Sequence, residues 1–219
     1  MRGLGSWEVN GRRRSPRPAP KTKALFTARI YGLIGRGAIG SSPLYDELVG
    51  LFGPHNRIFL MTETERRILA AQGYVELSLY AEARVELTKL PEEAGGRVDV
   101  LEILLLCLMA ESQWAEALAL TMRLCELEPE EPGGFIHAAF CLHELGRTNE
   151  AVDMLSRGPT ALRSKPVFYY NMGCYYARLG ELERALKLLR QSFEMDGSLR
   201  AVARKDPDLD GLRPALQRL

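Results

Sequence analysis

Apolar side chains in residues 64–196 recur every three or four positions, the spacing of amphipathic helices and not of strands. The pattern is clearest in residues 166–196, which predict two helices joined at Gly180. Gly180 suits the end of the first helix, because helices often end in a left-handed backbone conformation and glycine adopts it at the lowest energetic cost. Helices joined by so short a turn must pack antiparallel, and the small Gly173 and Ala185 let their backbones approach. The apolar positions of the two predicted helices are Phe168, Met172, Tyr175, Tyr176 and Leu179, then Leu182, Ala185, Leu186, Leu188, Leu189 and Phe193.

The same helix pair recurs at a constant spacing along the chain. Repeats begin at about residues 64, 98, 132 and 166, and a column of alanines falls in register through all four: Ala83, Ala117, Ala151 and Ala185. A single hairpin cannot bury both of its faces, so the copies are expected to stack on one another.

Gly173, Tyr176, Gly180, Ala185 and Leu189 stand in the order typical of one known unit. Residues 166–196 resemble the tetratricopeptide repeat, a helix–turn–helix of about 34 residues. The resemblance extends over residues 64–196. It implies an all-α fold, a right-handed superhelix (solenoid) of four helix-turn-helix repeats with a C-terminal capping helix.

The repeats depart from a regular pattern in two places. Pro91 comes early, so residues 91–97 are expected to form a loop between the first two repeats. Gly158 and Pro159 should shorten the second helix of the third hairpin. After the repeats, residues 198–219 are expected to form the cap. A short helix within residues 207–218 would place Leu209, Leu212 and Leu216 on one side, against the apolar end of the last hairpin.

The first 60 residues differ from the rest in composition. They hold ten Arg or Lys against three acids, whereas the remainder holds 19 against 25. We expect residues 1–60 to be a disordered or cryptic basic extension and residues 61–219 to be the repeat domain. A basic tail for nucleic acid or a mitochondrial transit peptide would explain the composition. We favour a non-native extension from an upstream start codon, because Met61 is followed by a capping box of Thr62 and Glu65.

Residues 35–40 contain a GxGxxG motif after a strand-like segment. In dinucleotide-binding folds this motif precedes a helix whose N-terminus binds the pyrophosphate. Here the chain after residue 61 is predicted to be helical throughout, and Glu63, the acid placed for a ribose, falls inside the capping box. A small nucleotide-binding enzyme is therefore the alternative hypothesis, and we expect no cofactor.

The cysteines and histidines do not form a recognisable metal motif. His137 and Cys141 share a helix face, but His143 points elsewhere and no carboxylate completes a ligand set. The four cysteines show neither CxxC nor secreted spacing, which favours reduced thiols and a cytoplasmic location. No apolar run is long enough to span a bilayer. We expect no metal and no membrane partner.

The resemblance implies that function lies on the concave face, lined by repeat positions two, five, nine, twelve and thirteen of each first helix. The carboxylate-binding clamp of lysines and asparagines known in co-chaperones of this family is missing here. The face is instead apolar and aromatic, which suits an extended or helical apolar segment. The candidate contact residues are Ile68, Leu106, Met109, Ile136, Phe140, His143, Tyr170 and Arg178.

These observations predict a non-enzymatic scaffold or adaptor for protein–protein interaction. A partner peptide or helix would bind in the concave groove, and a narrower version is a chaperone-like protein that holds an apolar client. No catalytic arrangement of serine, histidine and acid stands in a motif context. The acidic repeat body argues against nucleic acid as the partner.

Overall fold

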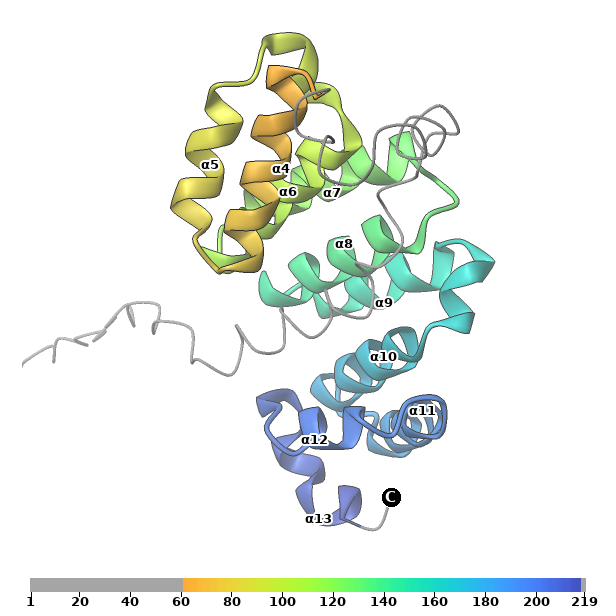
Figure 1. Ribbon diagram of the computed structural model, residues 1–219. Helices are drawn as coiled ribbons and strands as arrows, with labels where there is room; N and C mark the ends of the chain where they lie inside the picture. The colour runs from red at the N-terminus through yellow and green to blue at the C-terminus, as the bar shows by residue number, and fades with distance from the viewer. Residues whose placement is uncertain (1–60, 218–219) are drawn as a thin grey trace, which may run out of the picture.

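The computed structural model describes residues 61–217, and its regular secondary structure over that range is entirely helical. Four antiparallel hairpins follow one another and stack into a solenoid (Figure 1). The all-α repeat architecture predicted from the sequence is thereby confirmed. The hairpins are α4 (Glu63–Glu76) with α5 (Tyr80–Thr88), α6 (Val98–Ala110) with α7 (Trp114–Leu127), α8 (Pro132–Glu144) with α9 (Thr148–Arg157), and α10 (Pro166–Arg178) with α11 (Leu182–Met195).

Local sequence signals set where the helices begin. Thr62 caps α4 by accepting from the Glu65 backbone N–H, while Glu65 accepts from the Thr62 backbone N–H, so the predicted capping box is present. Helices α8 and α10 each begin at a proline, Pro132 and Pro166, where the missing N–H costs nothing.

All four hairpin turns use a left-handed residue at the same repeat position. Gly146 and Gly180 have φ of 79° and 84°, and Ser78 and Ser112 take up φ of 59° in the first two hairpins. A left-handed residue ends each first helix and reverses the chain within three residues. Serine incurs a steric cost there that glycine does not. The turn geometry is therefore imposed by the hairpin even where the residue is unfavourable.

Small residues hold the paired helices close together. Ala83, Ala117, Ala151 and Ala185 are all 0% exposed. At Gly173 a Cβ atom would lie only 2.7 Å from Leu189 Cγ and 3.3 Å from the Ala185 carbonyl oxygen. The backbones of α10 and α11 can approach this closely only because the residue is glycine.

The irregular places predicted from the sequence carry short 3₁₀ helices. Residues 91–97 include η2 (Glu92–Gly96), in which Ala94 is buried. Helix α9 ends at Arg157, directly before Gly158 and Pro159, and η3 (Thr160–Ser164) follows it. Leu162 of η3 is fully buried, so η3 supplies apolar contact where the shortened α9 does not reach.

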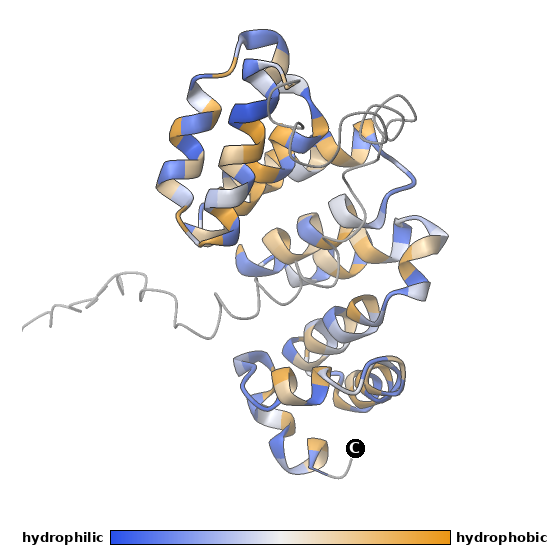
Figure 2. Ribbon diagram, in the orientation of Figure 1, coloured by the Kyte–Doolittle hydropathy of each residue, from blue (hydrophilic) through white to orange (hydrophobic). Residues whose placement is uncertain are grey.

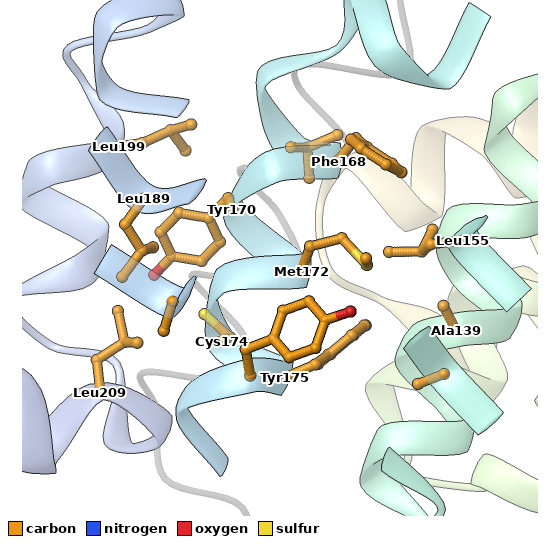
Figure 3. Close-up of a cluster of buried hydrophobic side chains, with 14 of the residues drawn as sticks. Ala139, Leu155, Phe168, Tyr170, Met172, Cys174, Tyr175, Leu189, Leu199 and Leu209 are labelled. Atoms are coloured by element: carbon orange, nitrogen blue, oxygen red, sulfur yellow. The ribbon is translucent and has the colours of Figure 1, made fainter. Parts of the chain in front are cut away.

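The core runs through the stack as three neighbouring clusters. Most helices carry both hydrophobic and hydrophilic residues (Figure 2). The largest cluster is built around α10, which is buried on two sides (Figure 3). Met172 and Tyr175 point toward Leu155 and Ala139 of the preceding hairpin. Tyr170 and Cys174 lie on the side of Leu209, in the C-terminal segment.

The chain beyond α11 ends the stack with three short elements. They are α12 (Leu199–Ala203), η4 (Pro207–Leu212) and α13 (Arg213–Leu216). Leu209 and Leu212 are buried as expected, and Leu216 is half-buried. The expected single helix within residues 207–218 is instead a 3₁₀ turn that leads into four α-helical residues.

Replacing Ala151 or Ala185 by leucine should destabilise the fold by about 1–3 kcal/mol each, because neither side chain has room to grow between the paired helices. The midpoint of urea unfolding measures the effect. Ala119→Leu on the exposed face of α7 is the matched control and should leave the midpoint almost unchanged. Unshifted midpoints for both core variants would contradict the assigned helix register.

Candidate partner-binding site

The inner face of the solenoid, as the repeat positions assign it, comprises the first helices α4, α6, α8 and α10. Six of the eight candidate contact residues are 9% exposed or less: Ile68, Met109, Ile136, Phe140, His143 and Tyr170. The Phe140 ring packs edge-on against Trp114, with 5.6 Å between the ring centroids. Leu106 is half-buried. Four of these side chains form a packed floor: Ile68, Met109, Ile136 and Phe140. Leu106 is more accessible than they are, so the candidates do not form an open apolar strip.

Three of the candidates, His143, Tyr170 and Arg178, lie against the C-terminal segment. Element η4 packs on α10, and Leu209 and Leu212 join the same hydrophobic cluster as Tyr170. Tyr170 is 0% exposed. The cap was expected at the apolar end of the last hairpin. It also reaches the inner face of α8 and α10, because its polar residues find partners there.

Asp206 is the central polar residue of this contact. Its carboxylate accepts a hydrogen bond from the Tyr170 hydroxyl at 2.7 Å and a weaker one from the Cys174 thiol at 3.6 Å. It also accepts from the Asp208 backbone N–H at 3.0 Å, which caps η4. Burial raises the pKa of Asp206, since a charged carboxylate loses hydration there, and the hydrogen bond from Tyr170 opposes that rise.

Asp208 extends the contact to two helices of the repeats. Its Oδ2 atom lies 2.9 Å from His143 Nε2 on α8, and its Oδ1 atom lies 3.7 Å from Arg178 Nε on α10. The other ring nitrogen of His143 is 3.1 Å from Thr148 Oγ1. The imidazole ring stacks at a tilt on Tyr175, with 4.8 Å between centroids. His143 is thus a junction between two repeats and the cap.

Arg213 makes hydrogen bonds within the cap that connect its elements. Its guanidinium donates to the carbonyl oxygens of Ala203 at 2.8 Å and Asp206 at 2.9 Å, and to the carboxylate of Asp210 at 2.6 Å. Sequence reasoning assigned no role to Asp206, Asp208 or Arg213. The run of Asp and Leu in residues 206–212 was the available signal, since burial of Leu209 brings the two acids that precede it onto the repeat surface.

Within residues 61–217, two buried polar atoms beside this contact have no hydrogen-bond partner. They are Asn171 Nδ2 and the Tyr175 hydroxyl oxygen, which lie one turn apart on α10. Burial raises the pKa of Tyr175 well above its usual value, so the hydroxyl stays protonated.

The three side chains considered for a metal are each in a different setting. Burial lowers the pKa of His137 to about 4 and raises the pKa of Cys141 to about 12. His143 is engaged with Asp208 and Thr148. Among the residues that the structure describes, no group of three or more His, Cys, Asp or Glu side chains is placed to hold a metal ion.

The GxGxxG motif at residues 35–40 lies outside the described residues. Glu63, the acid considered for a ribose, forms ion pairs with Arg66 and Arg67 in the first turn of α4. In the described part of the chain, no helix is both long and apolar enough to cross a membrane.

Residues 167–198, which comprise α10, α11 and the turn between them, match the family model of the tetratricopeptide repeat. The chain is a tetratricopeptide repeat protein. Tetratricopeptide repeats act as scaffolds for protein–protein interaction, and a protein partner is accordingly the kind of ligand that this fold serves.

A known protein is similar to this chain in sequence. Lipopolysaccharide assembly protein B of Escherichia coli K12 is 28% identical over 146 residues, which are 62% of this chain and 37% of that protein. The chain therefore spans less than two fifths of the length of that relative. The same relative from strains CFT073 and O157:H7 matches equally well.

Two solved structures share the tetratricopeptide repeat fold. TTC0263, a thermophilic protein of Thermus thermophilus, superposes with a TM-score of 0.56 at 18% identity, over 91% of this chain and 98% of that one. MamA of MSR-1 superposes with a TM-score of 0.51 at 16% identity, over 81% and 94% of the two chains. At such identities the likeness concerns the fold alone.

Replacing Tyr170 by phenylalanine should destabilise the protein by about 1–3 kcal/mol, because the buried carboxylate of Asp206 would lose its shortest hydrogen bond. Chemical denaturation of the full chain measures this change. Tyr169→Phe is the matched control, since Tyr169 is only half-buried and should cost far less. Equal effects of the two variants would show that the bond to Asp206 contributes nothing special.

Stability should fall as the pH drops from about 6.5 toward 4, because His137 is neutral in the fold while the unfolded chain takes up a proton near its usual pKa. Between pH 7 and pH 5 the loss from His137 should be about 2 kcal/mol. Asp206, with its raised pKa, acts in the opposite direction. Urea unfolding at both pH values, in the natural chain and in His137→Gln, measures the difference. If His137→Gln lost as much stability between pH 7 and pH 5 as the natural chain, the pH dependence would come from groups other than His137.

Proposed function

We propose that this tetratricopeptide repeat protein is a non-enzymatic scaffold or adaptor that binds a peptide or helix of a partner protein along its inner face. The observation that supports this proposal is the stack of four hairpins, with a repeat match in the last of them. A stacked array of this kind presents one continuous surface built from equivalent positions of successive first helices.

The part of the inner face proposed for the partner runs over α4, α6 and α8. Leu106 and Gln72 occupy the same repeat position on neighbouring first helices, and both are half-buried, so part of each side chain is accessible. Ile68, Met109, Ile136 and Phe140 would form the packed floor beneath the partner. An apolar floor with polar residues at its margin suits a helix or extended segment with apolar side chains.

The end of the inner face at α10 has a different proposed role. Tyr170 and His143 are engaged by Asp206 and Asp208 of the cap, so a partner would meet the cap there and not these two side chains. Arg178 is exposed and is held at 3.7 Å from Asp208, and it would contact a partner only at the edge of the groove.

The finer parts of the proposal rest on sequence features. The excess of acidic residues after residue 60 disfavours nucleic acid as the partner. The cysteines show neither CxxC nor the spacing of secreted proteins, which favours a cytoplasmic location. We propose residues 61–219 as the repeat domain and residues 1–60 as an extension outside it. A chaperone-like role, holding an apolar client, is the narrower form. The relative named for lipopolysaccharide assembly is longer than this chain, and its task is carried over to this chain only as a proposal.

Site-specific photo-crosslinking in a native extract tests the proposed surface. A benzoylphenylalanine residue at position 106 should crosslink a defined partner, because Leu106 lies on the groove. The same residue in place of Leu127, which is 48% exposed at the end of α7, is the matched control and should not crosslink that partner.

A charge substitution then tests the apolar nature of the contact. Leu106→Arg should weaken partner binding at least tenfold, since a buried apolar contact would be replaced by a charge. Leu127→Arg should bind as the natural chain does. Equal crosslinking from both positions, or unchanged binding by Leu106→Arg with its circular dichroism preserved, would overturn the proposed site.

A further inference from the structure

The C-terminal end of the solenoid contains a cavity that is separate from the inner face. Its volume is about 370 Å³, which is within the usual range for small-ligand sites. Helix α11 contributes Phe193, and the elements of the cap contribute Arg200, Ala203, Arg204, Arg213 and Leu216. Three guanidinium groups therefore line one cavity, and no acidic residue is among the described residues that line it.

Two of the three arginines are held in position by other contacts. Arg200 donates to the Phe193 carbonyl oxygen at 3.2 Å, and its guanidinium lies 5.4 Å from the centroid of the Phe193 ring. Arg213 is fixed by the carbonyl oxygens of Ala203 and Asp206 and by Asp210. Groups that are already ordered lose little conformational entropy when a ligand binds.

Arg204 supplies a charge that no described carboxylate balances. It is exposed, it follows α12 directly, and no ion pair to it is formed within residues 61–217. It is four residues from Arg200, the spacing at which two like charges on a helix repel each other. An anion placed beside Arg204 would balance its charge and accept charge-assisted hydrogen bonds.

Besides the arginines, the cavity is lined by Phe193, Ala203, Leu216 and the polar Gln217. Phe193 and Ala203 are 3% and 2% exposed, and Leu216 is half-buried beside them. Among these apolar residues, only Leu216 has appreciable accessible surface, and a bare inorganic anion would leave that surface without a partner. An organic acid would cover it with its apolar body while its carboxylate met the arginines.

We propose that this cavity binds an organic carboxylate, with the carboxylate held by Arg204 and Arg200 and an aromatic or aliphatic group packed on Leu216. Such a carboxylate is found both on small organic acids and at the C-terminus of a polypeptide. Binding here is independent of the partner proposed for the inner face, because the two surfaces share no residue.

Calorimetric titration of the full chain with N-acetylphenylalanine tests the proposal. Saturable binding is expected, and N-acetylphenylalaninamide, which has the same apolar body without the charge, should bind at least tenfold more weakly. Arg204→Gln should weaken binding of the acid about tenfold or more, the usual effect of losing one charge-assisted bond. Lys205→Gln is the matched control, because Lys205 is exposed and adjacent but does not line the cavity.

The outcomes separate clearly. No saturable binding, equal binding of acid and amide, or an equal effect of the Arg204 and Lys205 variants would overturn the site. Inorganic phosphate binding as tightly as the acid would overturn the assignment to an organic carboxylate. A short peptide ending in phenylalanine with a free carboxylate distinguishes the two sources. Tighter binding of this peptide than of N-acetylphenylalanine indicates a polypeptide terminus, and equal binding indicates a small acid.

Discussion

The close contact between the two helices of each hairpin is the constraint on which the rest of the structure depends. The contact requires a residue with no side-chain atom beyond Cβ at one position in the second helix of each hairpin. Alanine occupies that position in all four hairpins, and none of the four is exposed: Ala83, Ala117, Ala151 and Ala185. Gly173 extends the same constraint to the facing helix in the last hairpin. Once the helices are this close, larger residues on either side of the contact are directed toward the neighbouring hairpins, and stacking is the only way to bury them.

The last hairpin has no further repeat to cover it, and the cap takes that place. Leu209 and Leu212 supply the apolar contact that another first helix would otherwise provide. Burying this turn also brings carboxylates against the repeats, which would be costly without partners. Asp206 is bonded by Tyr170 and Cys174. Asp208 lies against His143 and Arg178. The end of the stack is therefore closed by apolar packing and by matched polar bonds together.

The cap also divides the molecule into surfaces with different chemistry. Against α8 and α10 it engages His143 and Tyr170 through Asp208 and Asp206. At the far end its own arginines, Arg200, Arg204 and Arg213, surround a cavity against Phe193. One short segment thus covers side chains of α8 and α10 and also lines a cationic cavity.

The repeat architecture can be read from the amino-acid sequence, because the signals that specify it are local. The spacing of the alanine column, the capping box at Thr62 and the turn glycines Gly146 and Gly180 each act within one helix pair. The sequence also located the interruption at Gly158 and the leucines of the cap. The polar contacts that accompany those leucines depend instead on how the chain folds in three dimensions. The bonds from Asp206 to Tyr170 and from Asp208 to His143 join residues 36 and 65 positions apart, and no periodicity encodes such a pairing. The burial of Tyr170 and the convergence of Arg200, Arg204 and Arg213 have the same origin, since both arise where the chain folds back on the repeats that precede it.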